Sequence, residues 1–512
     1  MHYVSLIVEA LRGRPRLVFW TAALTQAALW VVIPSLFYSA PPGEVPTVLA
    51  IGHEFLLGSY LGPPLAFWLG EIAFRIAGIV GVYLLAQACI VVTYWAIFTL
   101  GRAIVGTRHA ALGVLLMVGI AAFTVPSVDY GPAILAAPLW ALALLHYWRA
   151  LGEEKRGAWF LLALDLGLLL LTTYVGLILV ALLALFTVAT SQGRRALTYA
   201  EPWVCAVLLA IVVFPHAWWL VHQSDLVISG WDASAAMVGK VPSWGWLAAL
   251  LAASHLGLVL LVLLATGWPR GRRERARAPE IDRPPASPLG RAYVYVFALA
   301  PAAAAIAIVA VGGRLGPLGD IAPFLVLSGL AAITVAGDRV LLYRERLVSS
   351  AWLGILVVPP LIAVAGIAVM PWIASVDPKV AQPAGAEGRF FAETFQRRTG
   401  KPLEFVAGDQ RLAPLIALAA PSRPHVYFDW APKWSTWATA ADMRQAGGVL
   451  VWPATEASTT PPQALKKQFP TLVPEVPHSF ARSVQGLLPY IRLGWAVLRP
   501  QGQGKPPSVS PN

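Results

Sequence analysis

Residues 44–68 read EVPTVLAIGHEFLLGSYLGPPLAFW and lie between two long apolar segments. The stretch carries three ionisable side chains, a tyrosine and the proline pair Pro63-Pro64. A backbone of this composition could not satisfy its hydrogen bonds within hydrocarbon, so we expect an ordered loop at the membrane face. The loop is either a solvated connector or a site where carboxylates and a histidine stand above an apolar helix bundle.

The composition around this loop is that of a polytopic membrane protein. Of 512 residues, 58% are hydrophobic and only 12% are charged, whereas a soluble domain carries about 25% charged residues. The apolar run 17–38 is too long for the core of a signal peptide and lacks a small-residue cleavage site, so it predicts a first transmembrane helix. Cys89 and Cys205 both lie in apolar runs, so no disulfide framework is indicated.

Apolar runs of spanning length, about 20 residues each, continue along the chain to Ile373. The run 159–190 is too long for one upright helix, so we expect two shortened helices that turn at Leu171-Thr172-Thr173-Tyr174. These two segments and the runs below give about eleven spans. The other spans lie near residues 17–38, 79–100, 110–125, 131–145, 203–220, 247–267, 292–311, 321–336 and 351–373.

Basic residues indicate which loops face the cytoplasm. The loops expected outside hold only Arg75, Lys240 and Arg314. We therefore expect a cytoplasmic N-terminus and an extracytoplasmic C-terminus, and the net charge of +12 reflects topology, since no basic-aromatic module suggests nucleic acid. The run 270–291 is interpreted as a topology determinant facing anionic lipid. The basic residues expected inside are Arg12, Arg14, Arg16, Arg102, Arg108, Arg149, Lys155, Arg156, Arg194, Arg195, Arg270, Arg272, Arg273, Arg275, Arg277, Arg283, Arg291, Arg339, Arg344 and Arg346.

After Ile373 the composition becomes that of a soluble domain. Short strands alternate with helical stretches, which predicts a small α/β domain with a largely parallel sheet. We divide the chain into a transmembrane domain at 1–373 with an outer loop at 39–78, an extracytoplasmic domain at 374–500, and a disordered Pro/Ser/Gly-rich tail at 501–512. The expected strands are 403–407, 425–429 and 448–452, and the expected helices are 386–398, 412–420 and 438–445.

The loops expected on the outer face collect the polar candidates for a site. Asp129 lies just before Gly131 and a new span, where it could cap the helix or act in catalysis. Arg75 either snorkels to the interface or meets a phosphate. His216 and His222 stand beside tryptophans and are interpreted as interfacial anchors, with metal ligation as the alternative. The candidates are Glu44, His53, Glu54, Tyr60, Arg75, Asp129, Tyr174 and Lys240.

Three stretches together resemble the GT-C membrane glycosyltransferases, in particular relatives of protein O-mannosyltransferases and of the aminoarabinose and rhizobial lipopolysaccharide sugar transferases. The soluble tail, with Gly408-Asp409 and Arg423-Pro424, also resembles the outer domain of this subfamily, so the resemblance covers nearly the whole chain. The three stretches are Glu44 followed by Gly52-His53-Glu54 and by 58–69, Asp129 before a span containing Pro138-Leu139-Trp140, and the turn 171–176.

The resemblance implies an inverting transfer of a sugar from a polyprenyl-phosphate carrier to a lipid, glycan or protein acceptor, on the periplasmic side of a bacterial inner membrane. It implies a carboxylate that accepts the proton of the acceptor hydroxyl as the hydroxyl attacks C1, with Glu44 as first candidate and Asp129 as second. No metal ligand and no cofactor is assigned, and the residues do not decide whether a divalent metal assists. The residues expected to bind the donor or acceptor are His53, Glu54, Tyr60, Arg75, Tyr174 and Lys240.

Two residues depart from the pattern of that family. The aspartate expected in the first loop is Glu44, which is one methylene longer, and the lysine expected in the third stretch is Thr173. The second change removes a cation near the donor phosphate, for which Arg75 and Lys240 are the nearest substitutes. The alternative function is a non-enzymatic flippase of polyprenyl-linked sugars, or a catalytically degenerate relative that binds lipid.

Overall fold

The computed structural model describes residues 9–236, 242–267, 280–283, 285–313, 316–342, 344–374, 376–454, 460–470 and 472–501. The chain forms two compact units. The helical unit comprises Met1–Pro34, Leu57–Leu69 and Arg75–Ile362. The α/β unit comprises Ser35–Leu56, Gly70–Phe74 and Ala363–Asn512. The tail expected to be disordered, from residue 502 on, lies outside the described residues.

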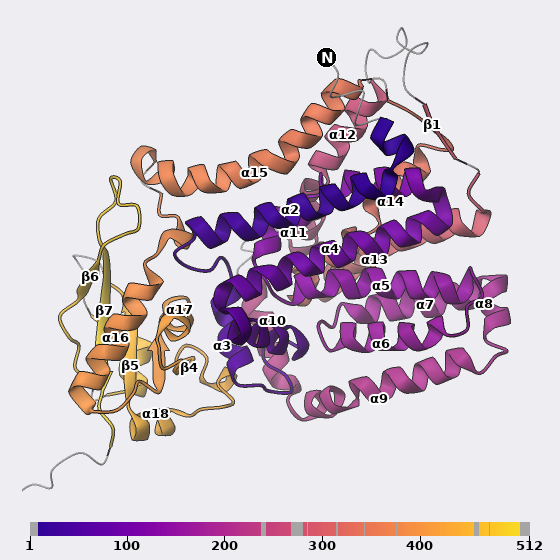
Figure 1. The fold of residues 1–512 in the computed structure, drawn as a ribbon. Coiled ribbons are helices and arrows are strands. Elements are labelled where there is room, and N and C mark those ends of the chain that lie inside the picture. Colours follow the sequence, from indigo (N-terminus) through magenta and orange to yellow (C-terminus); the bar gives the residue numbers. More distant parts are fainter. Residues whose placement is uncertain are drawn as a thin grey trace, which may run out of the picture. The chain divides into compact units, whose positions relative to one another are not determined.

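Helices dominate the first part of the chain (Figure 1). Six of the described helices are long and apolar enough to cross a membrane, and a seventh span results if the bent pair α11 and α12 counts as one. The prediction of a polytopic helical membrane protein is therefore confirmed, with six to seven candidate spans in the described chain where about eleven were expected. The six are α2 (Pro15–Phe37), α4 (Leu65–Met117), α5 (Pro132–Leu151), α9 (Glu201–His222), α13 (Pro288–Gly312) and α15 (Glu345–Ile373).

Part of the difference lies in α4, which takes in what the sequence suggested were two spans. The helix is interrupted by non-helical backbone at Ala77, Gly78 and Gly106. Gly78 has φ +60° and Gly106 has φ +76°, a region that glycine enters without a Cβ penalty. Beyond Met117 the apolar run continues as the 3₁₀ turns η1 (Ala121–Phe123) and η2 (Val125–Val128), so the predicted helix up to residue 125 is wrong.

The two shortened helices expected in the run 159–190 are confirmed as α6 (Ala158–Leu170) and α7 (Gly176–Ala189). Leu65 N–H donates to Leu171 O at 2.9 Å, which ties the turn between them to the start of α4. The remaining elements of this unit are α8 (Ser191–Ala196), α10 (Ser224–Ala236), α11 (Ser243–Ser254), α12 (Leu256–Thr266), η5 (Gly316–Gly319), η6 (Ala322–Leu325), α14 (Ser328–Val335) and a short antiparallel ribbon of β1 (Glu280–Asp282) and β2 (Arg339–Leu341).

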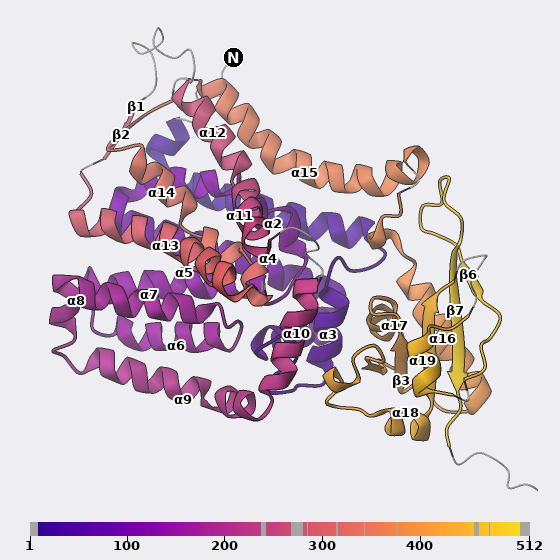
Figure 2. The same cartoon turned by 180° about the vertical axis from the view of Figure 1, so that it is seen from behind.

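Glycines allow the helices of this unit to pack closely. A Cβ on Gly329 of α14 would collide with Gly113 O of α4, and a Cβ on Gly257 of α12 would collide with Gly119 O. Small residues at helix contacts are the usual means by which helix backbones approach each other in membranes. Figure 2 shows these helices from behind, with α11 followed by α12.

Buried polar side chains in the helices pair with one another. His146 Nδ1 of α5 lies 2.5 Å from Asp165 Oδ2 of α6, and both residues are buried. Tyr94 O–H donates to Gln26 Oε1 at 3.2 Å. An ionisable group in an apolar bundle needs such a partner. The pair with His146 therefore accounts for Asp165, the one carboxyl group in the run 159–190.

The α/β unit contains a five-stranded sheet of order β4-β3-β5-β7-β6. The three expected strands are confirmed as β3 (Phe405–Gly408), β4 (His425–Tyr427) and β5 (Gly448–Pro453), and β3 pairs in parallel with both neighbours. β7 (Ile491–Leu498) pairs antiparallel with β5 and with β6 (His478–Phe480), so the sheet is mixed rather than largely parallel. The expected helices are confirmed as α16 (Ala384–Thr399), α17 (Leu412–Ala419) and α18 (Ala440–Ala446), and η7 (Lys379–Ala381), η8 (Pro432–Trp434) and α19 (Gln463–Gln468) complete the unit.

The Gly408-Asp409 pair ends β3 and starts α17. Asp409 Oδ1 accepts the backbone N–H groups of Arg411 and Leu412 at 3.0 Å each, which satisfies donors at the start of the helix. Gly408 N–H donates to the buried Asp429 Oδ1 at 3.0 Å. Burial raises the pKa of Asp429 to about 6. In this protein the pair is structural, since it fixes the turn between strand and helix.

The stretch expected as an irregular loop contains a helix. α3 (Val45–His53) has a proline in its first turn, where the missing N–H costs no helical hydrogen bond, and Val45 to Gly52 are all buried. The helix α3 packs against α17. Ala40, which precedes α3, packs against Ala384 of α16 and against α17. The backbone of α3 is thus satisfied by its own turns, and the expectation of a loop was wrong for these nine residues.

Candidate functional site

Glu44 stands at the N-terminal end of α3, in the α/β unit. It is the N-cap residue, with φ −94° and ψ 0°, and its side chain makes no capping hydrogen bond. Its backbone O accepts from Val48 N–H at 2.9 Å. The residue is exposed although the whole helix behind it is buried. The first catalytic candidate is therefore a carboxylate carried on a fixed helix end.

His53 and Glu54, at the other end of α3, take part in a network of ionisable groups. His53 Nδ1–H donates to Glu71 Oε1 at 3.2 Å, and Arg423 donates to Glu71 Oε2 at 2.6 Å. His425 Nδ1–H donates to Glu54 Oε1 at 2.6 Å. We call these five residues the Glu71 network. It joins the end of α3, the first turns of α4 and the start of β4 inside one unit.

Burial and backbone geometry both mark this network as tightly held. The side chain of Glu71 is 1% exposed and that of Glu54 is 8% exposed. Arg423 has φ +49°, a left-handed conformation that a non-glycine residue adopts at a cost of about 1–3 kcal/mol. Its guanidinium also lies 4.5 Å from the ring centroid of Phe74. Glu54, the one carboxylate predicted to bind sugar or acceptor, is thus held by a protein partner in this structure.

The pair of Glu54 and His425 predicts a pH-dependent stability. The hydrogen bond to Glu54 raises the pKa of His425 above its ordinary value of 6.5. A raised pKa in the folded state adds stability that is fully present below pH 6.5 and is lost as the pH rises through the folded pKa. The apparent melting temperature of the full chain in detergent should therefore fall as the pH rises from the acid to the alkaline side of that pKa.

Replacement of His425 by glutamine should flatten this fall. His478 offers a matched control, because burial lowers its pKa and its contribution has the opposite sign. A His478→Gln variant should keep the fall at rising pH. An unchanged melting profile in His425→Gln would show that the pair with Glu54 does not stabilise the folded state.

The turn at Tyr60 packs against aromatic residues of the helical unit. Ser59 and Gly62 exchange backbone hydrogen bonds of 2.9 and 3.0 Å, and Gly62 has φ +130°. A Cβ on Gly58 would collide with the ring of Trp219 in α9, and one on Gly230 of α10 would collide with Tyr60 O. Tyr60 is buried. The Gly-rich composition of the turn is therefore required by the close approach of α9 and α10.

Tyr174 and His216 form a second fixed pair in the helical unit. His216 Nδ1–H donates to Leu57 O at 2.8 Å, which leaves Nε2 to accept from Tyr174 O–H at 3.1 Å when the ring is neutral. The ring of Trp231 lies 5.9 Å from that of Tyr174. His216 is buried, so its interpretation as an interfacial anchor is wrong. His222 is exposed and bonds only its own helix among the described contacts.

Asp129 follows the 3₁₀ turn η2 and is partly buried. The N-cap of α5 is Gly131, and no side chain caps it, so the interpretation of Asp129 as that cap is not supported. The neighbours of Asp129 are fixed: Tyr130 O–H donates to Ala66 O at 3.1 Å, and Gln87 Nε2 lies 3.0 Å from Ser127 Oγ. The second catalytic candidate therefore stands on a rigid segment close to the start of α4.

Arg75 and Lys240 are the two cations expected near the donor phosphate. Arg75 is exposed and lies within α4, just before the break at Gly78. Lys240 lies outside the described residues. No group of three or more His, Cys, Asp or Glu side chains in the described parts of the chain could hold a metal ion. Of the predicted site residues, Glu44, His53 and Glu54 belong to the α/β unit, and Tyr60, Arg75, Asp129 and Tyr174 belong to the helical unit.

Three members of the Glu71 network were not among the predicted site residues. Glu71 stands three residues after Trp68 at the end of the Pro-Pro stretch, which was the signal that could have included it. Arg423 and His425 lie in the soluble domain, more than 350 residues further along. Nothing local in the sequence associates them with the first loop.

Comparison with known proteins agrees with this architecture. Residues 62–219 match the family model described as dolichyl-phosphate-mannose-protein mannosyltransferase. The crystal structure of ArnT from Cupriavidus metallidurans bound to undecaprenyl phosphate superposes with a TM-score of 0.57 and 14% identity, over 96% of this chain and 99% of that one. The apo structure of the same enzyme gives a TM-score of 0.49 and 14% identity, over 94% and 97% of the two chains. A search of curated protein sequences gives no match.

The family match covers Pro63-Pro64, Asp129 and the turn between α6 and α7, and it begins after the earlier part of the first stretch, which holds Glu44, His53, Glu54 and Tyr60. The ArnT structure covers nearly all of both chains, including the C-terminal mixed sheet. The predicted resemblance to the GT-C membrane glycosyltransferases is thereby confirmed: residues 62–219 carry the pattern of the dolichyl-phosphate-mannose-protein mannosyltransferase family, and the chain has the fold of ArnT.

Proposed function

We propose that the protein is an inverting glycosyltransferase that moves a sugar from a polyprenyl-phosphate donor to a lipid, glycan or protein acceptor. The observation that carries this proposal is the agreement of two independent comparisons. A mannosyltransferase family model matches residues 62–219, which include the end of the expected outer loop and Asp129, and ArnT, whose structure contains undecaprenyl phosphate, shares the fold over 96% of this chain. Both point to a donor that consists of an apolar tail, a phosphate and a sugar.

The reaction needs one base and one charge acceptor. Glu44 takes the proton of the acceptor hydroxyl while the hydroxyl oxygen bonds to C1 of the sugar. The bond between C1 and the phosphate oxygen breaks on the opposite face, so the anomeric configuration inverts and polyprenyl phosphate leaves with the bonding electron pair. Asp129 is the second candidate for the base. The exposed position of Glu44 on a buried helix supports its choice as the first.

The leaving phosphate gains negative charge in the transition state, and a nearby cation would stabilise that charge. Arg75 and Lys240 are our candidates, because Thr173 replaces the lysine expected from the resemblance. Arg423 is a poorer candidate, since it already donates to Glu71 at 2.6 Å. His53 and Glu54 then act on the substrate only if the Glu71 network opens, whereas Tyr60 and Tyr174 line the turn beside α9 and α10.

The basic residues of the loops support a location in a bacterial inner membrane, with the N-terminus in the cytoplasm and the C-terminal domain in the periplasm. The transfer site then faces the periplasm. This placement suits a donor that carries its sugar on the outer leaflet. Membrane lipids and the acceptor are the remaining partners, and no nucleic acid is involved.

The alternative, a flippase or an inactive lipid-binding relative, differs in the fate of the donor. A flippase needs polar groups open to the sugar through the depth of the bundle, whereas the buried His146 and Asp165 of the described helices pair with each other. Purified protein in liposomes should release polyprenyl phosphate from a donor panel. Movement of intact donor between leaflets without release would instead establish the flippase.

A further inference from the structure

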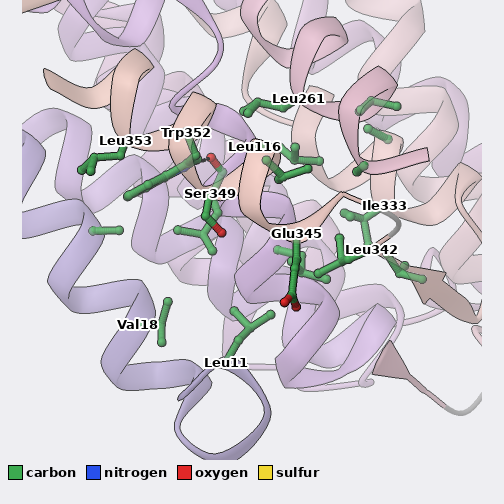
Figure 3. Close-up of a pocket in the computed structure, with 18 of the residues that line it drawn as sticks. Leu11, Val18, Leu116, Leu261, Ile333, Leu342, Glu345, Ser349, Trp352 and Leu353 are labelled. Carbon is green, nitrogen blue, oxygen red and sulfur yellow. Dashed lines mark hydrogen bonds between the residues drawn. The ribbon is translucent and has the colours of Figure 1, made fainter. Parts of the chain in front are cut away.

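An apolar pocket of about 1010 Å³ lies within the helical unit, and none of its lining residues belongs to the candidate site. Its walls come from the first half of α2, the last turns of α4, α12 and α14, the strand β2 and the first turns of α15. Figure 3 shows Leu116, Leu261 and Leu342 bordering the pocket. The volume lies at the upper end of the range of about 300–1,000 Å³ typical of small-molecule sites.

The lining is almost wholly aliphatic, with Trp352 as its largest side chain. Trp352 Nε1–H donates to Leu115 O at 2.8 Å, which fixes α15 against the end of α4 and holds the wall in place. The few polar side chains include Ser349, Arg339 and Glu345. Figure 3 shows Glu345 and Ser349 projecting from α15. A preformed apolar space with a polar end suits an amphiphile.

The polar end carries a predominantly positive charge. Arg339 lines the pocket and is exposed. Further exposed arginines lie in the segment before α2 and in the first turn of α2, which contribute Leu11 and Leu17 to the pocket. Arg108 Nε–H donates to Arg12 O at 3.1 Å, which brings this part of α4 to the same place. Against these stand four carboxylates of the described segments: Glu9, Glu345, Asp338 next to Arg339, and Asp282, which is opposite Arg339 in the β1–β2 ribbon. The basic residues are Arg12, Arg14, Arg16, Arg108, Arg339, Arg344 and Arg346.

We propose that this pocket binds an anionic diacyl phospholipid, with its phosphate at the arginines and its acyl chains among α2, α4, α12 and α15. Charge complementarity favours an anionic head group over a zwitterionic one. If each methylene-sized group takes about 30 Å³, as a water molecule does in the liquid, the pocket holds about thirty carbons, which is the content of two acyl chains. The pocket shares no residue with the proposed transfer site, and the proposal does not depend on the proposed function.

The test measures lipid retained by the full chain. The protein is reconstituted in nanodiscs of phosphatidylcholine with a minor share of phosphatidylglycerol, extracted gently, and examined by native mass spectrometry. Wild-type protein should retain one phosphatidylglycerol in preference to phosphatidylcholine. Ser349→Phe fills the pocket and should lower this retention about tenfold, a factor that corresponds to about 1.4 kcal/mol of binding free energy. Ala206→Phe, on an exposed face of α9, is the matched control and should retain the lipid.

Charge variants test the head-group end without filling the pocket. Arg339→Gln should lower the retention of phosphatidylglycerol several-fold, and more so at low salt. Glu345→Gln removes the opposing charge and should leave the retention equal or higher. Equal retention of both phospholipids by the wild type, or unchanged retention in both Ser349→Phe and Arg339→Gln, would overturn the proposal. Displacement of the phospholipid by added polyprenyl phosphate at lower concentration would also overturn it, in favour of a carrier site.

Discussion

Glu44→Gln is expected to lower sugar transfer by about 10²–10⁴-fold, the range that a general base contributes. The amide keeps the size of the side chain but cannot take the proton of the acceptor hydroxyl. The change should leave folding intact, because Glu44 is exposed and its side chain does not cap α3. Initial rates of polyprenyl phosphate release measure the loss of transfer, and melting temperatures measured in parallel show whether folding is intact.

Glu393→Gln is the matched control, because Glu393 is an exposed carboxylate on α16 in the same unit. It should retain the wild-type rate. Asp129→Asn tests the second candidate. If Asp129→Asn loses activity while Glu44→Gln keeps it, the base is Asp129. Wild-type turnover in Glu44→Gln would remove Glu44 from the mechanism altogether.

The second large effect is expected for stability, from breaking the ion pair of Glu71 and Arg423. Glu71 is 1% exposed, so removing its partner leaves a buried charge that water cannot solvate. Losing one member of a buried pair costs about 3–5 kcal/mol. For Arg423→Gln we expect a loss of unfolding free energy at the low end of this range, since His53 still donates to Glu71 and the Arg423 side chain is 21% exposed.

A double-mutant cycle with Glu71→Gln and Arg423→Gln separates the pair energy from other effects. The pair of Arg398 and Glu475, in the same unit, is the control: both side chains are about one-third exposed, and such a pair contributes about 0–1 kcal/mol. A coupling energy for Glu71 and Arg423 no larger than that of the control would show that the network does not hold α3 to the soluble domain.

The sequence predicted the helical membrane class because spanning helices are apolar along their whole length. It gave about eleven spans, more than the six to seven of the described helices, because short apolar helices such as α6 and α7 also read as spans in the sequence. The boundary expected between residues 100 and 110 falls at Gly106, where non-helical backbone divides the 53 residues of α4. The two shortened helices were predicted correctly because the basic loops before the first helix and after the second have to lie on the same side of the membrane.

The helix α3 was missed because its stability comes from residues far away in the chain. Charged residues, glycine and a proline pair surround it and suggest a loop. Its burial depends on packing against α17, some 360 residues later, which local patterns do not reveal. The mixed sheet was missed for the same reason: β6 and β7 follow long irregular segments and pair antiparallel only once β5 is in place.

The candidate site shows the same limit. The chemistry of Glu44, His53 and Glu54 was visible in the sequence as ionisable residues in an otherwise apolar region. Their hydrogen-bond partners in the folded protein were not visible in the sequence, since His425 lies 371 residues from Glu54. Sequence patterns thus identified the residue types, while the assignment of His53 and Glu54 to protein partners required the fold.

Phosphorus NMR of the purified protein with its donor tests the proposed function most directly. A glycosyl phosphodiester and a phosphomonoester give separate resonances. With a cell-envelope extract added as the source of acceptor, cleavage of the bond between C1 and the phosphate is observed without knowing which molecule takes the sugar. For one member of a polyprenyl-phosphate sugar panel, we expect the wild-type protein to convert the diester signal into the monoester signal, and Glu44→Gln to leave it unchanged. A diester signal that persists with every donor, while the protein binds at least one of them, would contradict the assignment as a transferase.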